Sequence, residues 1–129
     1  MKKSRILGMV ALLASVVLLA VGCVSSKQES LSLRDNEIPT LYSVVGEREI
    51  VGTDTEVTND TQITTLTYQK NSVSQADVDA YVAKLKEDGF EEISSMVLSK
   101  ASQKEGEQVT ITIALDENGS TTIQYTAGK

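Results

Sequence analysis

The chain has 129 residues, about the length of one domain, and its 23% charged and 40% hydrophobic residues are typical of a globular protein. It contains no histidine, which excludes Ser-His-Asp and Cys-His catalytic sites and every His-ligated metal centre. Its single cysteine, Cys23, excludes an intrachain disulfide and any cysteine-rich metal site. The composition therefore excludes several classes of catalytic and metal site and does not indicate a particular reaction.

The first 22 residues have the three zones of a secretory signal peptide. A positive start without nearby acidic residues is followed by a largely apolar run over 6–21, and small residues then lead to Cys23. The basic residues are Lys2, Lys3 and Arg5. The apolar run is short for a bilayer span, which needs about 20 residues. The pattern predicts a signal peptide over residues 1–22.

The end of this segment resembles the lipobox of bacterial lipoproteins, where a small residue precedes the cysteine that is acylated. Gly22 precedes Cys23 here, and Ala20 stands at the position where leucine is usual. The resemblance implies signal cleavage between Gly22 and Cys23 and diacylglycerol on the Cys23 sulfur. It implies an extracytoplasmic protein, lipid-anchored to the bacterial cell membrane, which two or more acyl chains would hold stably. An uncleaved signal anchor with a free cysteine is the alternative.

Cleavage would change the charge of the protein. Removal of residues 1–22 takes away three positive charges and no negative ones, so the net charge moves from −6 to −9. Such a domain is repelled by anionic lipid headgroups and by nucleic acid, so no nucleic-acid partner is predicted. Cationic partners and divalent ions are compatible with this charge, although high acidity more often only favours solubility.

The mature chain is predicted to be a tether followed by one small domain. Residues 24–37 are polar, with only Leu31 and Leu33 to bury, which indicates that 23–37 comprise the lipidated Cys23 and a flexible tether. A 14-residue coil of this kind spans about 20 Å. Residues 38–129 then form a single domain with one core, expected to be monomeric.

The domain is expected to open with a short helix at 39–45, because proline suits the first helical position and Gly46 suits the residue past the end. A strand through Tyr42–Val45 competes with this prediction. Strands are predicted over 47–56 and 61–69. Threonine fills seven of the fifteen positions from 53 to 67, which is typical of a solvated strand face. A ligand-binding threonine array is the less favoured interpretation.

The best-specified element is a helix from about Gln75 to Asp88. Ser74 is a suitable N-cap, and Asp77 lies in the first turn, where a negative charge is stabilising. Gly89 and the apolar Phe90 follow, as in a Schellman ending. The residues at helical spacing that make one apolar stripe are Val78, Tyr81, Val82 and Leu85.

Three strands are predicted after the helix, over 91–100, 108–115 and 121–126, and Asp116–Gly119 is a hairpin signal between the last two. The order ββαβββ predicts an α+β fold, in which an antiparallel sheet packs one main helix on one face. The residues expected beneath the helix are Val109, Ile111, Ile113 and Leu115. The residues expected on the opposite, exposed face are Thr110, Thr112, Thr122, Gln124 and Thr126.

The stretch from Tyr68 to Phe90 resembles a pattern in small lipoproteins of Gram-positive cell envelopes. The residues that carry it are Tyr68-Gln69-Lys70, Val78-Asp79-Ala80-Tyr81-Val82, Leu85 and Gly89-Phe90. Those families are largely uncharacterised, so the resemblance implies no catalytic or binding residue. A looser similarity to the helix-plus-meander modules of envelope-assembly lipoproteins and of β-lactamase-inhibitor-like domains concerns the fold alone.

Two acidic segments share some features with calcium loops. In Asp54–Asp60, Asn59 stands where an EF-hand needs glycine, and Thr65 stands where it needs glutamate. In Asp116–Gly119 the glycine comes two residues too early. Both segments are interpreted as turns, with weak surface cation binding as the alternative, and no metal or cofactor site is predicted.

The sequence favours a non-catalytic interaction module of the cell envelope, held by acyl chains on Cys23 and binding an unknown envelope protein or ligand. No catalytic residue is predicted, and the protein is not expected to be an enzyme. The alternative is a small-ligand or cation-binding lipoprotein, for example a transport accessory. A pocket lined by Tyr42, Tyr68 or Tyr125 would favour that alternative.

Overall fold

The computed structural model describes residues 24–129, and this part of the chain is mostly β, with eight strands in two antiparallel sheets and only 16% helix. The elements are β1 (Ser30–Leu33), β2 (Asn36–Pro39), α2 (Tyr42–Val45), β3 (Ile50–Val57), β4 (Thr61–Tyr68), α3 (Gln75–Glu87), β5 (Glu91–Ser94), β6 (Val97–Ala101), β7 (Gln108–Leu115) and β8 (Thr121–Gly128). The predicted α+β packing with the order ββαβββ is therefore wrong. The predicted signal peptide and Cys23 lie outside the described residues.

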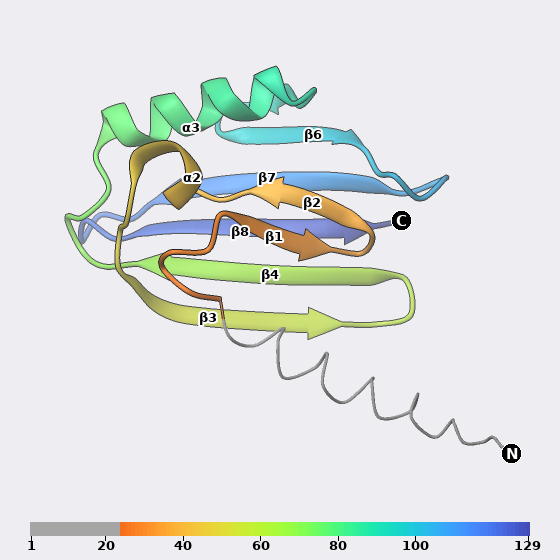
Figure 1. Cartoon of the computed structure of the whole chain (residues 1–129), viewed down its shortest axis with the longest axis horizontal. Helices are drawn as coiled ribbons and strands as arrows, with labels where there is room; N and C mark the ends of the chain where they lie inside the picture. The colour runs from red at the N-terminus through yellow and green to blue at the C-terminus, as the bar shows by residue number, and fades with distance from the viewer. Residues whose placement is uncertain (1–23) are drawn as a thin grey trace, which may run out of the picture.

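The larger sheet has six strands in the order β3-β4-β8-β7-β6-β5, and every neighbouring pair is antiparallel (Figure 1). β8, the last strand of the chain, lies in its interior between β4 and β7. The two edges are β3 and the short β5, so strands from both halves of the chain meet at β8. Within residues 24–129, no helix is both long and apolar enough to cross a bilayer.

The segment predicted as a flexible tether forms the second sheet, a hairpin of β1 and β2. Leu31 pairs with Ile38, and the side chains of Leu31 and Leu33 are buried in the main core. The two turn residues, Arg34 and Asp35, both have positive φ, as a type I′ hairpin turn requires. The tether prediction is wrong here. Leu31 and Leu33 are two positions apart and point to the same side of a strand, and their burial against the larger sheet stabilises β1 although the segment is otherwise polar.

The predicted single strand over 91–100 is also wrong, because β5 and β6 form a second hairpin within it. The chain reverses at Ser95 and Met96, and Met96 adopts a φ of +61°. Ile93, an apolar residue within the predicted strand, is 63% exposed on the edge strand β5. No glycine or proline marks this turn, so its sequence signal is weak.

Helix α3 is confirmed together with both of its predicted caps. The Ser74 hydroxyl accepts a hydrogen bond from the Asp77 backbone N–H, and the Asp77 carboxylate accepts one from the Ser74 N–H, which makes a capping box. The Phe90 N–H donates to the Leu85 carbonyl over 3.0 Å, and Gly89 adopts a φ of +101°, which completes the Schellman ending. Of the predicted short helix over 39–45, only Tyr42–Val45 is helical, as α2, and Pro39 is the last residue of β2 rather than the first position of the helix.

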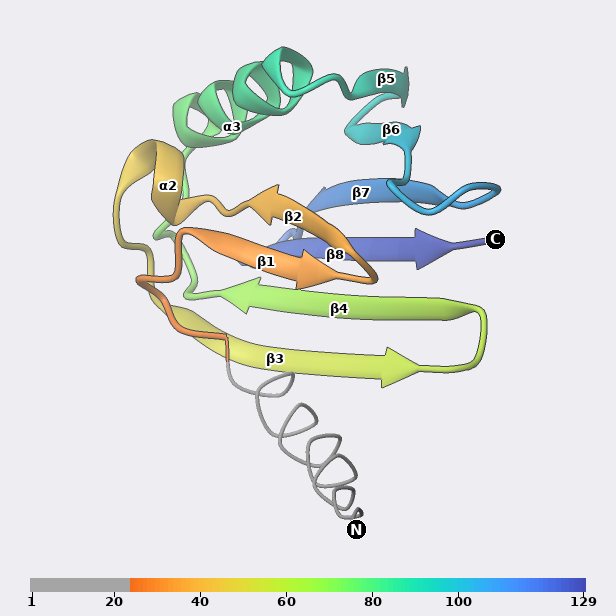
Figure 2. The ribbon, with the colours of Figure 1, turned by 45° about the vertical axis from the view of Figure 1, so that its right-hand side comes forward.

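One face of the six-stranded sheet is covered by α3, α2 and the β1–β2 hairpin (Figures 1 and 2). We call it the covered face. Side chains from these elements and from alternate positions of the central strands form one core. Its largest fully buried members are Tyr81, Tyr125, Leu33, Ile38, Leu41, Leu66, Leu85, Leu98, Ile111 and Ile123. The helix α3 and the β1–β2 hairpin thus both cover the sheet, whereas the prediction had α3 alone packed on it.

Candidate functional site

The opposite face of the six-stranded sheet, which we call the open face, has no layer over it among residues 24–129 (Figure 2). Two complete cross-strand rows define it, because directly paired residues point to the same side of a sheet. One row is Asp54, Thr65, Gln124, Thr112, Val97 and Ser94. The other is Glu56, Ile63, Thr126, Thr110, Ser99 and Glu91.

Small polar side chains dominate this surface. Gln124 is exposed, and the threonines are half-buried among their neighbours: Thr65, Thr67, Thr110, Thr112, Thr122 and Thr126. The predicted alternation of β7 and β8 is confirmed, because Val109, Ile111 and Ile113 are buried on the covered face. Leu115 is the exception: it is 49% exposed, since it ends β7 beside the hairpin turn. The open face is therefore a broad surface of hydroxyl, methyl and amide groups.

The charges within the two rows of the open face are all negative. Asp54 and Glu56 come from the edge strand β3, and Glu91 comes from the opposite edge strand β5. Lys100, a basic residue of β6, does not belong to either row, because it pairs with Val109, which points to the covered face. Its Nζ lies over the Phe90 ring, 4.9 Å from the ring centroid. The face therefore offers hydroxyls between two carboxylate-bearing edges and favours polar or cationic groups.

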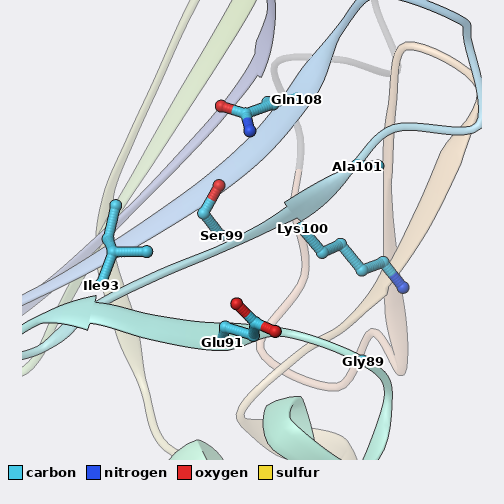
Figure 3. Close-up of a pocket in the computed structure, with 7 residues that line it drawn as sticks. All are labelled: Gly89, Glu91, Ile93, Ser99, Lys100, Ala101 and Gln108. Carbon is cyan, nitrogen blue, oxygen red and sulfur yellow. The ribbon is translucent and has the colours of Figure 1, made fainter.

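A small pocket of about 280 Å³ lies where β5, β6 and β7 meet (Figure 3). Lys100 lines the pocket and Ile93 contributes an apolar wall, and the other polar lining groups are the Glu91 carboxylate, the Ser99 hydroxyl and the Gln108 amide. These groups can accept hydrogen bonds from an ammonium or hydroxyl group. They contain no nucleophile paired with a base. Across residues 24–129, no three His, Cys, Asp or Glu side chains gather as metal ligands.

Of the two acidic segments compared with calcium loops, Asp116–Gly119 forms a turn, whereas Asp54–Asp60 contributes its first four residues to β3 and only 58–60 to the turn. Thr58 and Thr61 close the β3–β4 turn, since the Thr58 N–H donates to the Thr61 carbonyl over 2.8 Å. In the β7–β8 turn the Asp116 N–H donates to the Ser120 carbonyl, and the Asn118 side-chain oxygen accepts from the Ser120 N–H. Hydrogen bonds within the chain thus close both turns.

The tyrosines weighed as pocket residues do not line the pocket. Tyr125 and Tyr81 are fully buried, and their hydroxyls lie 2.8 Å apart, with the Tyr81 hydroxyl also donating to the Pro39 carbonyl over 2.6 Å. Burial raises the pKa of both phenols well above the ordinary value, and raises that of Tyr68 to about 12. Tyr42, in α2, is half-buried. The buried tyrosines therefore join α3 and β2 to the central strand β8.

A buried ion pair that the sequence does not indicate holds the hairpin turn to the rest of the protein. The Arg34 guanidinium donates to both carboxylate oxygens of Glu107, over 3.1 Å and 2.7 Å, and the Glu107 side chain is 1% exposed. This hydrogen bonding lowers the pKa of Glu107 below its ordinary value. Beside it, buried Asn36 donates to the Ser102 hydroxyl and accepts from the Gln103 N–H. The hairpin is thus docked by specific polar contacts as well as by Leu31 and Leu33.

The predicted lipidation residue, Cys23, and the predicted cleavage residue, Gly22, lie outside the described residues. The residues that follow them belong to the folded domain. Val24 packs against the core, and the Ser26 hydroxyl accepts a hydrogen bond from the Ile50 N–H at the start of β3. The domain therefore begins within one to three residues of Cys23.

No family model matches the chain, and no curated protein and no solved structure gave a significant match.

Proposed function

We propose that this protein is a lipid-anchored, extracytoplasmic interaction module of the cell envelope, which binds its partner through the open face and catalyses no reaction. The signal-like segment and the lipobox resemblance around Cys23 support the anchoring. The single observation that carries the binding role is the open face itself. A six-stranded surface of small polar side chains has no covering layer among residues 24–129.

The chemistry of the open face fits a reversible partner better than a permanent one. Obligate interfaces bury extensive apolar surface, whereas this face offers hydroxyl and amide groups that are also well solvated in the free protein. β-Branched threonines have few rotamers, so little side-chain freedom is lost when a partner covers them. A partner held in this way gains specificity from shape and hydrogen bonds and binds with modest affinity. A membrane anchor offsets modest affinity by raising the effective concentration near its partner.

A small-ligand or cation-binding lipoprotein is the second candidate, and the pocket beside Glu91 is the observation that favours it. The pocket is small, and Glu91 supplies its only carboxylate. Because Lys100 also lines the pocket, a small polar ligand fits this lining better than a bare cation. The two candidates differ in the binding position: a small ligand would occupy the pocket at one end of the open face, whereas a protein partner would cover the face itself.

Site-specific photocrosslinking in native membranes tests the proposal. A photoreactive residue replaces Thr112 or Gln124 on the open face, and a matched one replaces Ala83 or Glu87 on the exposed side of α3. We expect a discrete adduct from the open-face positions that Thr110→Arg, introduced in the same chain, abolishes. Adducts of equal yield from the α3 positions would contradict the assignment of this face.

Mass spectrometry of the membrane-extracted protein tests the anchoring separately. We expect the mature chain to begin at Cys23 with acyl chains attached, and we expect Cys23→Ser to accumulate as the unprocessed precursor. An intact, unacylated chain from Met1 to Lys129 in the wild type would contradict lipidation and would leave the crosslinking result standing.

A further inference from the structure

The first described residues, 24–28, contact the domain, and these contacts determine which edge of the sheet lies nearest the predicted anchor. Val24 packs against the core, the Gln28 N–H donates to the Ser25 carbonyl, and the Ser26 hydroxyl accepts from the Ile50 N–H over 3.1 Å. The Thr40 hydroxyl then donates to the Gln28 carbonyl. The chain is therefore engaged with the domain from its first described residues onward. Figures 1 and 2, which differ by 45°, both show this start beside β3.

The covalent chain leaves little distance between Cys23 and that edge. Consecutive Cα atoms are about 3.8 Å apart, so the Cα of Cys23 lies within about 11 Å of the Cα of Ser26. Ser26 in turn contacts Ile50, the first residue of β3. Acyl chains on Cys23 would therefore enter the membrane close to β3, without the spacer that a flexible tether would supply.

The far edge of the same sheet is much more distant. β3 and β5 are the two edges of a six-stranded sheet, and neighbouring strands lie about 4.8 Å apart, which separates the edges by about 24 Å. We propose that the protein stands edge-on at the lipid surface, with β3 against the headgroup layer and β5 pointing away from it. This orientation rests on the anchoring at Cys23 that we propose above.

The short chain between Cys23 and β3, rather than attraction between charges, would hold β3 at the lipid surface. Val51 and Val57 are 53% and 57% exposed, and they are two of the four exposed large hydrophobic residues within residues 24–129. Asp54 and Glu56 carry negative charges that anionic headgroups repel, so the contact rests on the short distance to the anchor and on the two valines, and it is expected at lipids without net charge. Shielding by the membrane would also protect the free edge of β3 from pairing with strands of other chains.

The edge-on orientation leaves both binding surfaces accessible. The open face stands upright from the membrane, and the pocket at Glu91 lies at the end farthest from it. A face-down orientation would instead press Thr112 and its neighbours against the lipid and would exclude a partner from them. The edge-on orientation is therefore compatible with both a short anchor and an accessible open face.

Quenching of a single introduced tryptophan tests the orientation, because the natural chain has no tryptophan. Val51→Trp and Ile93→Trp place matched reporters at exposed hydrophobic positions on the two edge strands, and Thr112→Trp places one on the open face. The full chain is purified from bacterial membranes and reconstituted in phosphatidylcholine vesicles that carry nitroxide quenchers on the lipid headgroups. We expect Val51→Trp to be quenched several-fold more than Ile93→Trp, with Thr112→Trp between them.

Two other patterns would overturn the proposal. Equal quenching at Val51→Trp and Ile93→Trp would show no preferred edge, and strongest quenching at Thr112→Trp would show a face-down protein. Should mass spectrometry find Cys23 unacylated, its thiol, the only one in the chain, is coupled to a maleimide lipid and the quenching is repeated. The same ranking is expected, because the distance from Cys23 to β3 does not depend on the acylating enzyme. A failure of lipidation and a failure of the orientation thus give different results.

Discussion

The two faces of the six-stranded sheet use the same strands and differ only in which alternate residues point to them. On β7, Ile111 is fully buried on the covered face, whereas Thr112, its neighbour in the chain, is half-exposed on the open face. The covered face receives its layer from α3 and from a hairpin that comes much earlier in the chain. The open face receives none among residues 24–129. One alternating pattern therefore supplies the stability of the fold on one side and a surface for binding on the other.

The largest effect is expected from Ile111→Ala, on the covered face. This side chain is fully buried in the core, and truncation of buried aliphatic residues leaves a cavity. We expect a loss of about 2–5 kcal/mol in the free energy of unfolding. Urea denaturation followed by circular dichroism measures it. A loss below about 1 kcal/mol would mean that the covered face is not the closed core described above.

Leu33→Ala is expected to cost a similar amount, about 2–5 kcal/mol, because Leu33 on β1 is fully buried in the same core. Its matched control is Ser32→Ala, whose exposed hydroxyl bonds only to the exposed Glu37. The same denaturation experiment compares the two. If both variants unfold like the wild type, the hairpin does not contribute to the core and residues 24–37 behave as the tether that the sequence suggested.

A smaller loss, about 1–3 kcal/mol, is expected from Tyr81→Phe, because the change leaves the Pro39 carbonyl and the Tyr125 hydroxyl without their shared partner in a buried site. Tyr125→Phe is the comparison, since it leaves the bond from Tyr81 to Pro39 in place. Thermal unfolding of both variants should rank Tyr81→Phe as the less stable. The reverse ranking would contradict the bridging role of the Tyr81 hydroxyl.

The ion pair of Glu107 predicts a pH-dependent effect. Because Arg34 lowers the pKa of Glu107 below its ordinary value of 4.5 in the folded protein, the pair stabilises the fold above that pH. Its contribution is lost as the pH falls through the lowered folded pKa. Glu107→Gln should therefore have a lower thermal midpoint than the wild type at pH 7. The two midpoints should converge as the pH is lowered below 4.5, and a constant difference down to pH 2 would contradict the assignment to this carboxylate.

The smallest effect is expected at Thr112→Ala on the open face, within about 0.5 kcal/mol of the wild type, as for ordinary surface positions. The same denaturation experiment measures it beside Ile111→Ala. A loss as large as that of Ile111→Ala would mean that the open face is buried, which would require a second layer or a constitutive dimer.

The sequence predicts those parts of the fold whose signals are local. Ser74, Asp77 and Gly89 mark the two ends of α3, and the alternation along 108–115 places Thr112 on the face opposite Ile111. The two missed hairpins lack such signals, because their turns use Arg34, Asp35 and Met96 at positive φ, without glycine. The polarity of 24–37 also conceals β1, since Leu31 and Leu33 make a buried strand only through contacts with distant residues.

In the candidate site, too, the features with a local sequence signal were predictable and those formed by distant residues were not. The threonine face follows from period-two alternation, which a sequence displays directly. The pocket does not, because Glu91 and Gln108 come from β5 and β7 and approach each other only after β6 is inserted between them. The Arg34–Glu107 pair joins residues 73 apart in the chain, and no local pattern identifies such partners.

The interior position of β8 has a consequence for the order of folding. Residues 24–120 can form the β3–β4 hairpin and the β5–β7 meander, but no strand pairing joins these two groups until Thr121–Gly128 inserts between β4 and β7. The pairing of Leu66 with Ile123 closes a long loop, which is slow relative to hairpin formation. β8 thus completes the sheet, so during synthesis β4 and β7 have no common neighbour until Thr121–Gly128 has been made. Removal of residues 121–129 should leave the β3–β4 hairpin and the β5–β7 meander unpaired and should take Ile123 and Tyr125 out of the core, so we expect the cooperative transition in urea denaturation to be lost.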